Sequence, residues 1–306
     1  MKKILVIYYS QTGQLKNILN SILFPFINNP LFTIHFEEIK PKKQFLFPWT
    51  ILNFFDTFPE SVLEIPIEIE PVKFNTDENY DLIILGYQPW YLSPSLPITS
   101  FLQTEECKKT FKNRNIVTVI GCRNMWLMSQ EKIKKRIHNI GGNIVGNIAL
   151  SDKAKNLISV FTISYWMFRG KKQSLFNIFP LPGVNDKEIE NASVFGNIIL
   201  EHVNIGTVEK LQTQLLENKA VKIYTDLMFI EKKANRIFNL WAKFIRNNSN
   251  YGSKKRCIFL NLFIIYLFTA LYVISPFISI FLFLTKSFRI KSIGREISYF
   301  SQNTIK

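Results

Sequence analysis

An uncharged, strongly apolar run near the C-terminus constrains the fold of this chain more than any other feature. It covers 28 residues, Cys257 to Leu284, and reads CIFLNLFIIYLFTALYVISPFISIFLFL. A helix that crosses a bilayer needs about 20 predominantly apolar residues. A buried helix of a soluble protein rarely runs so long with apolar residues on every face. The run therefore predicts a hydrophobic helical extension that associates with a membrane.

The orientation of this segment stays open at the level of sequence. Basic residues stand on both sides of it, so the positive-inside rule gives no preferred direction. A break at Ser275-Pro276 could turn the chain back, with both flanks on the same side of the membrane. We expect a monotopic or re-entrant anchor at the cytoplasmic face of the inner membrane, in preference to a single tilted span. The flanking cations are Lys254, Lys255, Arg256, Lys286, Arg289, Lys291 and Arg295.

The basic charge of the chain is concentrated in the same part of the sequence. The net charge is +15 over 306 residues. Residues 201–306 carry 16 Lys and Arg against 6 Asp and Glu, whereas residues 1–200 carry 22 against 17. A basic surface suits either nucleic acid or anionic lipid. Because the basic part also holds the apolar run, we expect a membrane partner and no nucleic acid.

Strand-like and helix-like segments alternate over the first 200 residues. The unbroken apolar runs suit strands that are buried on both faces. The alternation predicts an α/β fold with a doubly wound, parallel, five-stranded sheet. Ser129 is expected to cap a helix that ends before Gly141-Gly142. The expected strands are 3–8, 32–39, 82–86, 115–121 and 143–150.

The turn after the first expected strand has the composition of an anion site. The sequence KKILVIYYSQTGQLKNIL leads from a strand through Ser10, Gln11, Thr12 and Gly13 into a helical pattern. Backbone N–H groups at a helix N-terminus lack internal partners and point outward, which favours a phosphate. The turn matches neither a Walker motif nor a Rossmann fingerprint, since it has a single glycine and no Gly-Lys-Ser/Thr. A turn without a ligand remains an alternative.

Two further strand ends are expected at the same edge of the sheet. The third strand is followed by Pro89, Trp90 and Tyr91, whose rigid rings suit stacking on a planar ligand. The fourth is followed by Arg123 and Asn124, whose polar groups could bind a heterocycle or stabilise a developing negative charge. Ordinary loop packing is the alternative for these aromatic residues.

The ordered motifs YYSQTG, YDLIILGYQPWY and VTVIGCRNMW resemble the flavodoxin-like fold that binds FMN, over about residues 1–203. The resemblance implies a phosphate loop around the first turn, with the flavin ring between the second and third loops. Leu15 departs from the family, which usually has a hydroxyl residue there, so only its backbone N–H would contact phosphate. The implied FMN-binding residues are Ser10, Gln11, Thr12, Gly13, Gln14, Leu15, Pro89, Trp90, Tyr91, Cys122, Arg123 and Asn124.

A closer resemblance is to the flavodoxin-like proteins of dialkylresorcinol biosynthesis, the pathway that also supplies flexirubin pigments. The opening ILVIYYSQTGQL, the GCRNMW loop and the hydrophobic C-terminal extension carry it. It implies oxidation of a dialkylated cyclohexane-1,3-dione to a dialkylresorcinol, with FMN as acceptor, a lipophilic substrate and a ketosynthase as a pathway partner. A membrane-tethered NAD(P)H:quinone reductase and a non-catalytic scaffold stay open as alternatives.

The candidate catalytic residues for this aromatisation are Arg123 and Tyr91. Arg123 would stabilise an enolate, and Tyr91 is the candidate for proton transfer. The alternative is that both residues only bind flavin. Cys122 lacks a basic partner nearby in the sequence, and no cysteine spacing indicates a metal site or a disulfide framework. Residues expected to be structural are His35, His138 and His202; the other cysteines are Cys107 and Cys257.

Two aromatic-rich segments interrupt the α/β pattern. They are an insert at about 40–80, with FLFPWTILNFF, and a stretch within 158–182. Aromatic residues prefer boundaries between apolar and wet surroundings, so we expect these segments to wall an alkyl-chain channel or to rest on the membrane. Additional core is the alternative. The expected parts are an FMN-binding domain at 1–205, a basic helical connector at 206–250 and a membrane-anchoring segment at 251–306.

Overall fold

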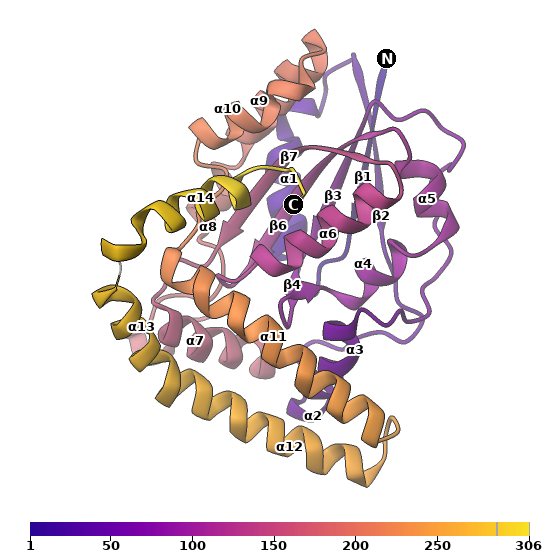
Figure 1. Ribbon diagram of the computed structural model, residues 1–306. Helices are drawn as coiled ribbons and strands as arrows, with labels where there is room; N and C mark the ends of the chain where they lie inside the picture. Colours follow the sequence, from indigo (N-terminus) through magenta and orange to yellow (C-terminus); the bar gives the residue numbers. More distant parts are fainter. Residues whose placement is uncertain (286, 306) are drawn as a thin grey trace.

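The computed structural model describes residues 1–285 and 287–305, and a five-stranded parallel sheet lies at its centre (Figure 1). Lys286, one of the expected flanking cations, lies outside the described residues. The strand order is β2-β1-β3-β6-β7, with every neighbouring pair parallel. This order is that of a flavodoxin-like doubly wound sheet and confirms the predicted fold class. The strands are β1 Lys2–Tyr8, β2 Phe32–Glu38, β3 Leu82–Tyr87, β6 Asn115–Cys122 and β7 Asn143–Ser151.

Helices cover both faces of the sheet, as the apolar strands require. On one face, alternate residues of β1 such as Ile4 and Val6 pack against α1, α9 and α10. Gly196 of α9 allows this close packing, because a Cβ there would lie 1.8 Å from the carbonyl oxygen of Ile22. This face carries α1 Gln14–Leu23, α8 Asp186–Glu190, α9 Ser193–Ile205 and α10 Leu211–Glu217.

The opposite face of the sheet buries a second apolar cluster. Leu5 and Ile7 of β1 pack there with residues of α4 Leu96–Phe101, α5 Glu105–Phe111 and α6 Leu127–Asn139. The two clusters therefore use alternate residues of the same strand, which is why the strand sequence is apolar without interruption. Short 3-10 segments lie at Phe24–Phe26, Leu175–Asn177, Val208–Lys210 and Ser287–Arg289.

The aromatic insert and the stretch after β7 form helices beside the carboxyl edge of the sheet. The insert contains α2 Ile51–Asp56 and α3 Phe58–Leu63, and residues after β7 form α7 Asn156–Arg169. A small hairpin of β4 Pro89–Trp90 and β5 Ser93–Pro94 follows β3. α3 makes extensive contacts with the long helix α11 Thr225–Asn248. These segments form an additional layer at the edge where ligands of doubly wound sheets bind.

The apolar run forms one continuous helical rod, and the expected chain reversal at Ser275-Pro276 is wrong. α12 Lys254–Thr269 passes through a π-helical turn, η4 Ala270–Ile274, into α13 Ser275–Leu284 without turning back (Figure 1). Pro276 lacks an N–H group and would clash in a regular helix. A π-helical turn just before a proline absorbs that mismatch, so the helix continues. The last helix is α14 Ile290–Ser301.

A buried arginine attaches this rod to the insert. The Arg256 side chain is 1% exposed, and its guanidinium forms ion pairs with Asp56 and with Glu60, the latter at 2.6 Å. Phe263 of α12 stacks on Phe58 of α3 with ring centroids 3.7 Å apart. The first half of the rod therefore packs along α11 and the insert.

Candidate functional site

The loops that follow β1, β3 and β6, here called the first, second and third loops, meet at the carboxyl edge of the sheet. Gln11 of the first loop contacts both the second loop and the insert. Its backbone N–H donates to Oε1 of Gln88, at the end of β3, over 3.0 Å. Its side-chain amide donates to the carbonyl of Phe45 in the insert over 2.8 Å. The backbone of Gln11 therefore joins the first loop to the second, and its side chain, expected at a phosphate, joins the first loop to the insert.

The turn between β1 and α1 has several backbone N–H groups without a partner among the described residues. Gly13, the N-cap residue of α1, adopts a φ of 81° and has no side chain to accept a helix N–H group. The Thr12 and Ser10 hydroxyls accept the N–H groups of Gln14 and Lys16 at 3.5 and 3.4 Å. A Cβ on Gly13 would meet nothing within 4 Å, so the space beside the turn is open. Among the described residues, no acceptor contacts the backbone N–H groups of Thr12, Gly13 or Leu15. Unpaired N–H groups at a helix N-terminus fit a phosphate.

Side chains around this turn support its backbone. The Ser10 hydroxyl accepts the N–H of Lys16 at 3.4 Å. The Gln14 amide forms two hydrogen bonds with the backbone of Val184, at 3.0 and 3.1 Å. The Leu15 side chain is fully buried in the core and packs beside Gly121. Leu15 can therefore contribute only its N–H group, as the departure from the family motif implies.

The two aromatic residues of the second loop, Trp90 and Tyr91, pack against different parts of the molecule. Trp90 packs edge-to-face against Tyr9, Phe45 and Trp49, beside the first turn. Tyr91 turns away with a φ of 49° and donates its hydroxyl to the carbonyl of Phe54 over 2.8 Å. Burial raises the pKa of the Tyr91 hydroxyl well above its usual value, so Tyr91 stays protonated. Its role in proton transfer stays a prediction.

The third loop presents a guanidinium held by an amide. Arg123 Nη1 and the Asn124 side-chain nitrogen both donate to Oδ1 of Asn156, the first residue of α7, at 2.7 and 3.0 Å. Burial lowers the pKa of Arg123 to about 10, which leaves it charged at neutral pH. Among the described residues, no carboxylate forms an ion pair with Arg123. The buried Oδ1 of Asn124 also lacks a hydrogen-bond partner. Both groups are therefore available to a ligand.

Glu231 of α11 is a site residue that the sequence analysis missed. It is 1% exposed, and its carboxylate accepts the N–H of Met128 at 2.8 Å. Burial raises the pKa of Glu231 to about 8, an effect that the charge of Arg123 opposes. The predicted cap Ser129 is wrong, because α6 begins at Leu127 and Ser129 is buried in its first turn. A carboxylate 103 residues away in sequence supplies the cap instead.

An apolar cavity of ≈ 330 Å³ adjoins Arg123 and Cys122. Its walls come from the second loop, both aromatic-rich segments, α11 and the rod. That the two segments wall a channel for an alkyl chain or rest on a membrane stays a prediction. Burial raises the pKa of the Cys122 thiol, which makes it a poor nucleophile at neutral pH. Representative lining residues are Phe54, Pro89, Tyr91, Val160, Met167, Ile237 and Leu271.

Comparison with solved structures returns flavoproteins. A flavoprotein from Lactobacillus acidophilus, solved in complex with FMN, is 20% identical, covers 50% of this chain and 94% of its own, and has a TM-score of 0.39. An archaeal flavodoxin is 13% identical, with coverages of 66% and 99% and a TM-score of 0.34. Megasphaera elsdenii flavodoxin is 15% identical, with coverages of 50% and 89% and a TM-score of 0.30. No protein-family model and no curated protein matches the chain.

The strand order β2-β1-β3-β6-β7 and its parallel connections establish the fold assignment. The site itself combines an open anion turn, a charged guanidinium and an apolar cavity at one sheet edge. Within residues 1–285 and 287–305, no group of three or more His, Cys, Asp or Glu is placed to hold a metal ion.

Proposed function

We propose that this protein is a membrane-associated, FMN-dependent oxidoreductase that converts a dialkylated cyclohexane-1,3-dione to a dialkylresorcinol. The observation that carries the proposal is the position of Arg123. It is a charged side chain without a carboxylate partner among the described residues, next to an apolar cavity. An enolisable dione with alkyl chains has the matching properties, an acidic head and apolar tails. The sequence resemblance to proteins of dialkylresorcinol biosynthesis supports the same substrate class.

The residues present fit FMN. The N–H groups of Thr12, Gly13 and Leu15 would hold its phosphate, and Trp90 and Pro89 would contact its ring on one side. On the other side, Asn124 Oδ1 lacks a partner and can accept a ring N–H. When bound, FMN supplies the acceptor for the two electrons that aromatisation removes.

The chain's own residues would stabilise charge and exclude water. Arg123 would bind the enolate oxygen of the dione, and in an apolar cavity such a contact is stronger than in water. Tyr91, which stays protonated, can donate a proton but cannot accept one at neutral pH. Glu231 acts as a positioning residue, because its carboxylate fixes the start of α6 directly after the loop that carries Arg123. The aromatic walls of the cavity would keep alkyl chains and exclude water.

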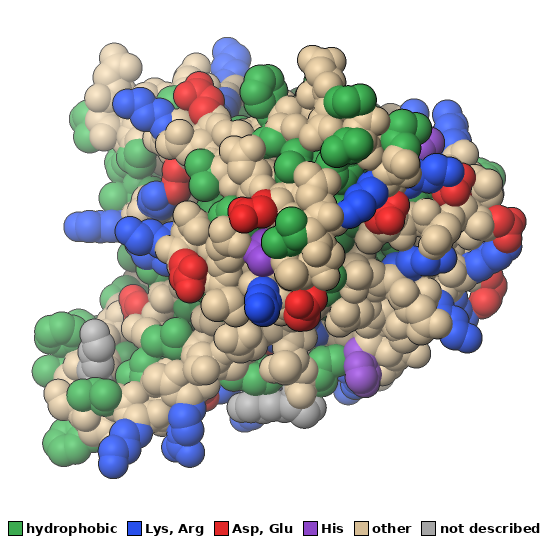
Figure 2. Space-filling model, turned by 90° about the horizontal axis from the view of Figure 1, so that it is seen from above, with side chains coloured by type: hydrophobic (Ala, Val, Ile, Leu, Met, Phe, Trp, Pro, Cys, Tyr) green, Lys and Arg blue, Asp and Glu red, His purple; other side chains and the backbone are tan. Residues whose placement is uncertain are grey.

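The rod is our candidate membrane anchor. In the part of the chain that the structure describes, Lys254–Leu284 is the single helix long and apolar enough to cross a membrane. In its most apolar stretch of 18 residues, 11% is buried. Large side chains such as Phe277 and Phe283 are 70% and 77% exposed. Hydrophobic side chains gather at the corner where the rod ends, with Lys and Arg beside them (Figure 2). We propose that this surface rests on anionic lipid at the cytoplasmic face of the inner membrane.

The test is purification in detergent followed by an absorbance spectrum and anaerobic addition of a dialkylcyclohexane-1,3-dione. The proposal predicts a yellow protein whose flavin absorbance bleaches as a dialkylresorcinol forms, without NAD(P)H. A colourless protein that also fails to bind added FMN would contradict the flavin assignment. Bleaching by NAD(P)H with quinone reduction, and no resorcinol from the dione, would contradict the substrate assignment and favour a quinone reductase.

A further inference from the structure

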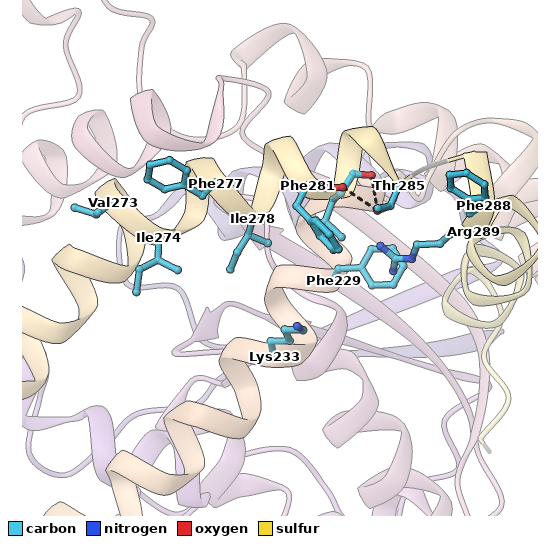
Figure 3. Close-up of a pocket in the computed structure, with 11 residues that line it drawn as sticks. Phe229, Lys233, Val273, Ile274, Phe277, Ile278, Phe281, Thr285, Phe288 and Arg289 are labelled. Carbon is cyan, nitrogen blue, oxygen red and sulfur yellow. Dashed lines mark hydrogen bonds between the residues drawn. The ribbon is translucent and has the colours of Figure 1, made fainter.

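A second cavity lies between α11 and α13, on the side of the rod away from the insert. Its volume is ≈ 730 Å³, and it shares Lys233, Ile274 and Ile278 with the inner cavity of ≈ 330 Å³. Figure 3 shows Ile274 and Ile278 on one helix and Lys233 on α11 pointing into the same gap. The two cavities therefore share part of their lining, and the inner one extends to Arg123.

The outer cavity combines apolar walls with cations at its rim. Phe277 and Phe281 line it from α13, and Phe229 lines it from α11. The Arg289 guanidinium lies 3.7 Å from the centre of the Phe229 ring (Figure 3). In residues 1–285 and 287–305, neither Lys233 nor Arg289 forms an ion pair. Unpaired cations at the mouth of an apolar cavity favour a molecule with an anionic head and a hydrocarbon tail.

The polar groups along the path indicate which end of such a molecule enters first. The charged residues that line the inner cavity are Arg123 and Lys233, and Lys233 also lies at the rim of the outer cavity. Most other residues that line the inner cavity are apolar. An anionic head could therefore pass from the rim cations to Arg123, while its tail stays between α11 and α13. Both helices also border the exposed apolar surface of the rod, so the tail need not cross water.

Building on the proposed function, we infer that the two cavities form one channel, through which a single-chain or dialkyl amphiphile with an acidic or enolic head enters from the lipid surface. Ile278 lines both cavities, as Ile274 and Lys233 do, and it is the shared residue on α13. The neighbouring Ile280 is 58% exposed and is absent from the lining of either cavity. The pair gives a matched test with the same residue type on the same helix.

The experiment uses the full chain in phosphatidylcholine nanodiscs and hexadecanoic acid with a terminal diazirine as the probe. After irradiation, labelled peptides are mapped by mass spectrometry. The channel predicts labelling of peptides that contain Phe229, Ile274 or Phe281. Ile278→Trp should lower this labelling roughly tenfold, because the larger indole obstructs the passage to Arg123 and weakens binding of the probe, while Ile280→Trp leaves it unchanged. Circular dichroism confirms that both variants are folded.

The outcomes separate the channel from the proposed function. Equal labelling of the two tryptophan variants would overturn the channel, whatever the flavin content. Stronger labelling of the same peptides by a diazirine-bearing phosphatidylglycerol, not displaced by the free acid, would make the cavity a lipid site and also overturn it. Labelling that depends on Ile278 in a protein that binds no FMN would keep the channel and contradict the proposed function.

Discussion

Two arginines in this protein occupy opposite electrostatic surroundings. Arg256 is 1% exposed and paired with two carboxylates, those of Asp56 and Glu60. Arg123 donates to the side-chain and backbone oxygens of Asn156, and among the described residues no acid forms an ion pair with it. A buried charge that is paired with carboxylates holds a structure together, whereas one that forms no ion pair remains available for an anion. Arg256 therefore marks the region that attaches the rod to the insert, and Arg123 marks the region that we propose binds a ligand.

The largest expected effect is on stability, at Arg256. Arg256→Ala leaves Asp56 and Glu60 without their partner, which should cost about 3–5 kcal/mol of the free energy of unfolding. Chemical denaturation in detergent measures the change. Lys254→Ala, which alters an exposed residue of the same helical turn, should change it by less than about 0.5 kcal/mol. Equal losses in both variants would show that the ion pairs of Arg256 have no special role.

Arg123→Ala should lower the activity and leave the stability almost unchanged, the converse of Arg256→Ala. Loss of the guanidinium should reduce the rate of resorcinol formation by roughly a hundredfold or more, the usual effect of removing a group that stabilises a developing anion. The free energy of unfolding should change little, because no ion pair is broken among the described residues. Arg123→Lys should restore part of the rate. If Arg123→Ala kept full activity but lost stability, Arg123 would have the structural role that we assign to Arg256.

Glu231 provides a pH test of the same region. Its pKa of about 8 in the folded protein is above the ordinary 4.5, so the folded state binds the extra proton between these values. The free energy of unfolding should therefore fall as pH rises from 5 to 8, by up to about 1.4 kcal/mol per pH unit. Glu231→Gln should flatten this dependence while still accepting the N–H of Met128.

The matched control for that test is Asp226→Asn, an exposed acid on the same helix. Thermal unfolding of the three proteins at several pH values provides the comparison. If the wild type and Glu231→Gln lost stability in parallel as pH rose, Glu231 would not be the titrating group. If Asp226→Asn alone flattened the profile, the buried carboxylate would have no part in it.

The smallest expected effect concerns the anion turn. Gly13→Ala and Gly206→Ala both place a Cβ at positive φ, at 81° and 73°, with nothing within 4 Å. Each should cost about 1 kcal/mol of stability through backbone strain. Gly13→Ala should in addition weaken FMN binding, measured by quenching of flavin fluorescence, because its methyl group enters the space beside the free N–H groups. Equal FMN affinity in both variants would remove the phosphate assignment from this turn.

The sheet and its ligand edge were predictable because their signals are local. Apolar runs such as Leu82–Tyr87 mark strands buried on both faces, and all five expected strands are confirmed to within two residues at each end. The turn at Gly13 was also predictable, since a glycine between a strand and a helical pattern marks a βα turn. The length of the apolar rod followed from composition alone.

Only the tertiary structure decided how distant segments complete the site. Glu231 reaches the start of α6 from 103 residues away, and no periodicity or spacing in the sequence indicates that contact. Ser129 looked like a helix cap because propensity is local, yet packing buried it and moved the helix start. The continuity of the rod through Pro276 depends on a π-helical turn that composition does not encode. Sequence determines elements through short-range preferences, whereas the cavity beside Arg123 exists because the insert, α7, α11 and the rod pack together.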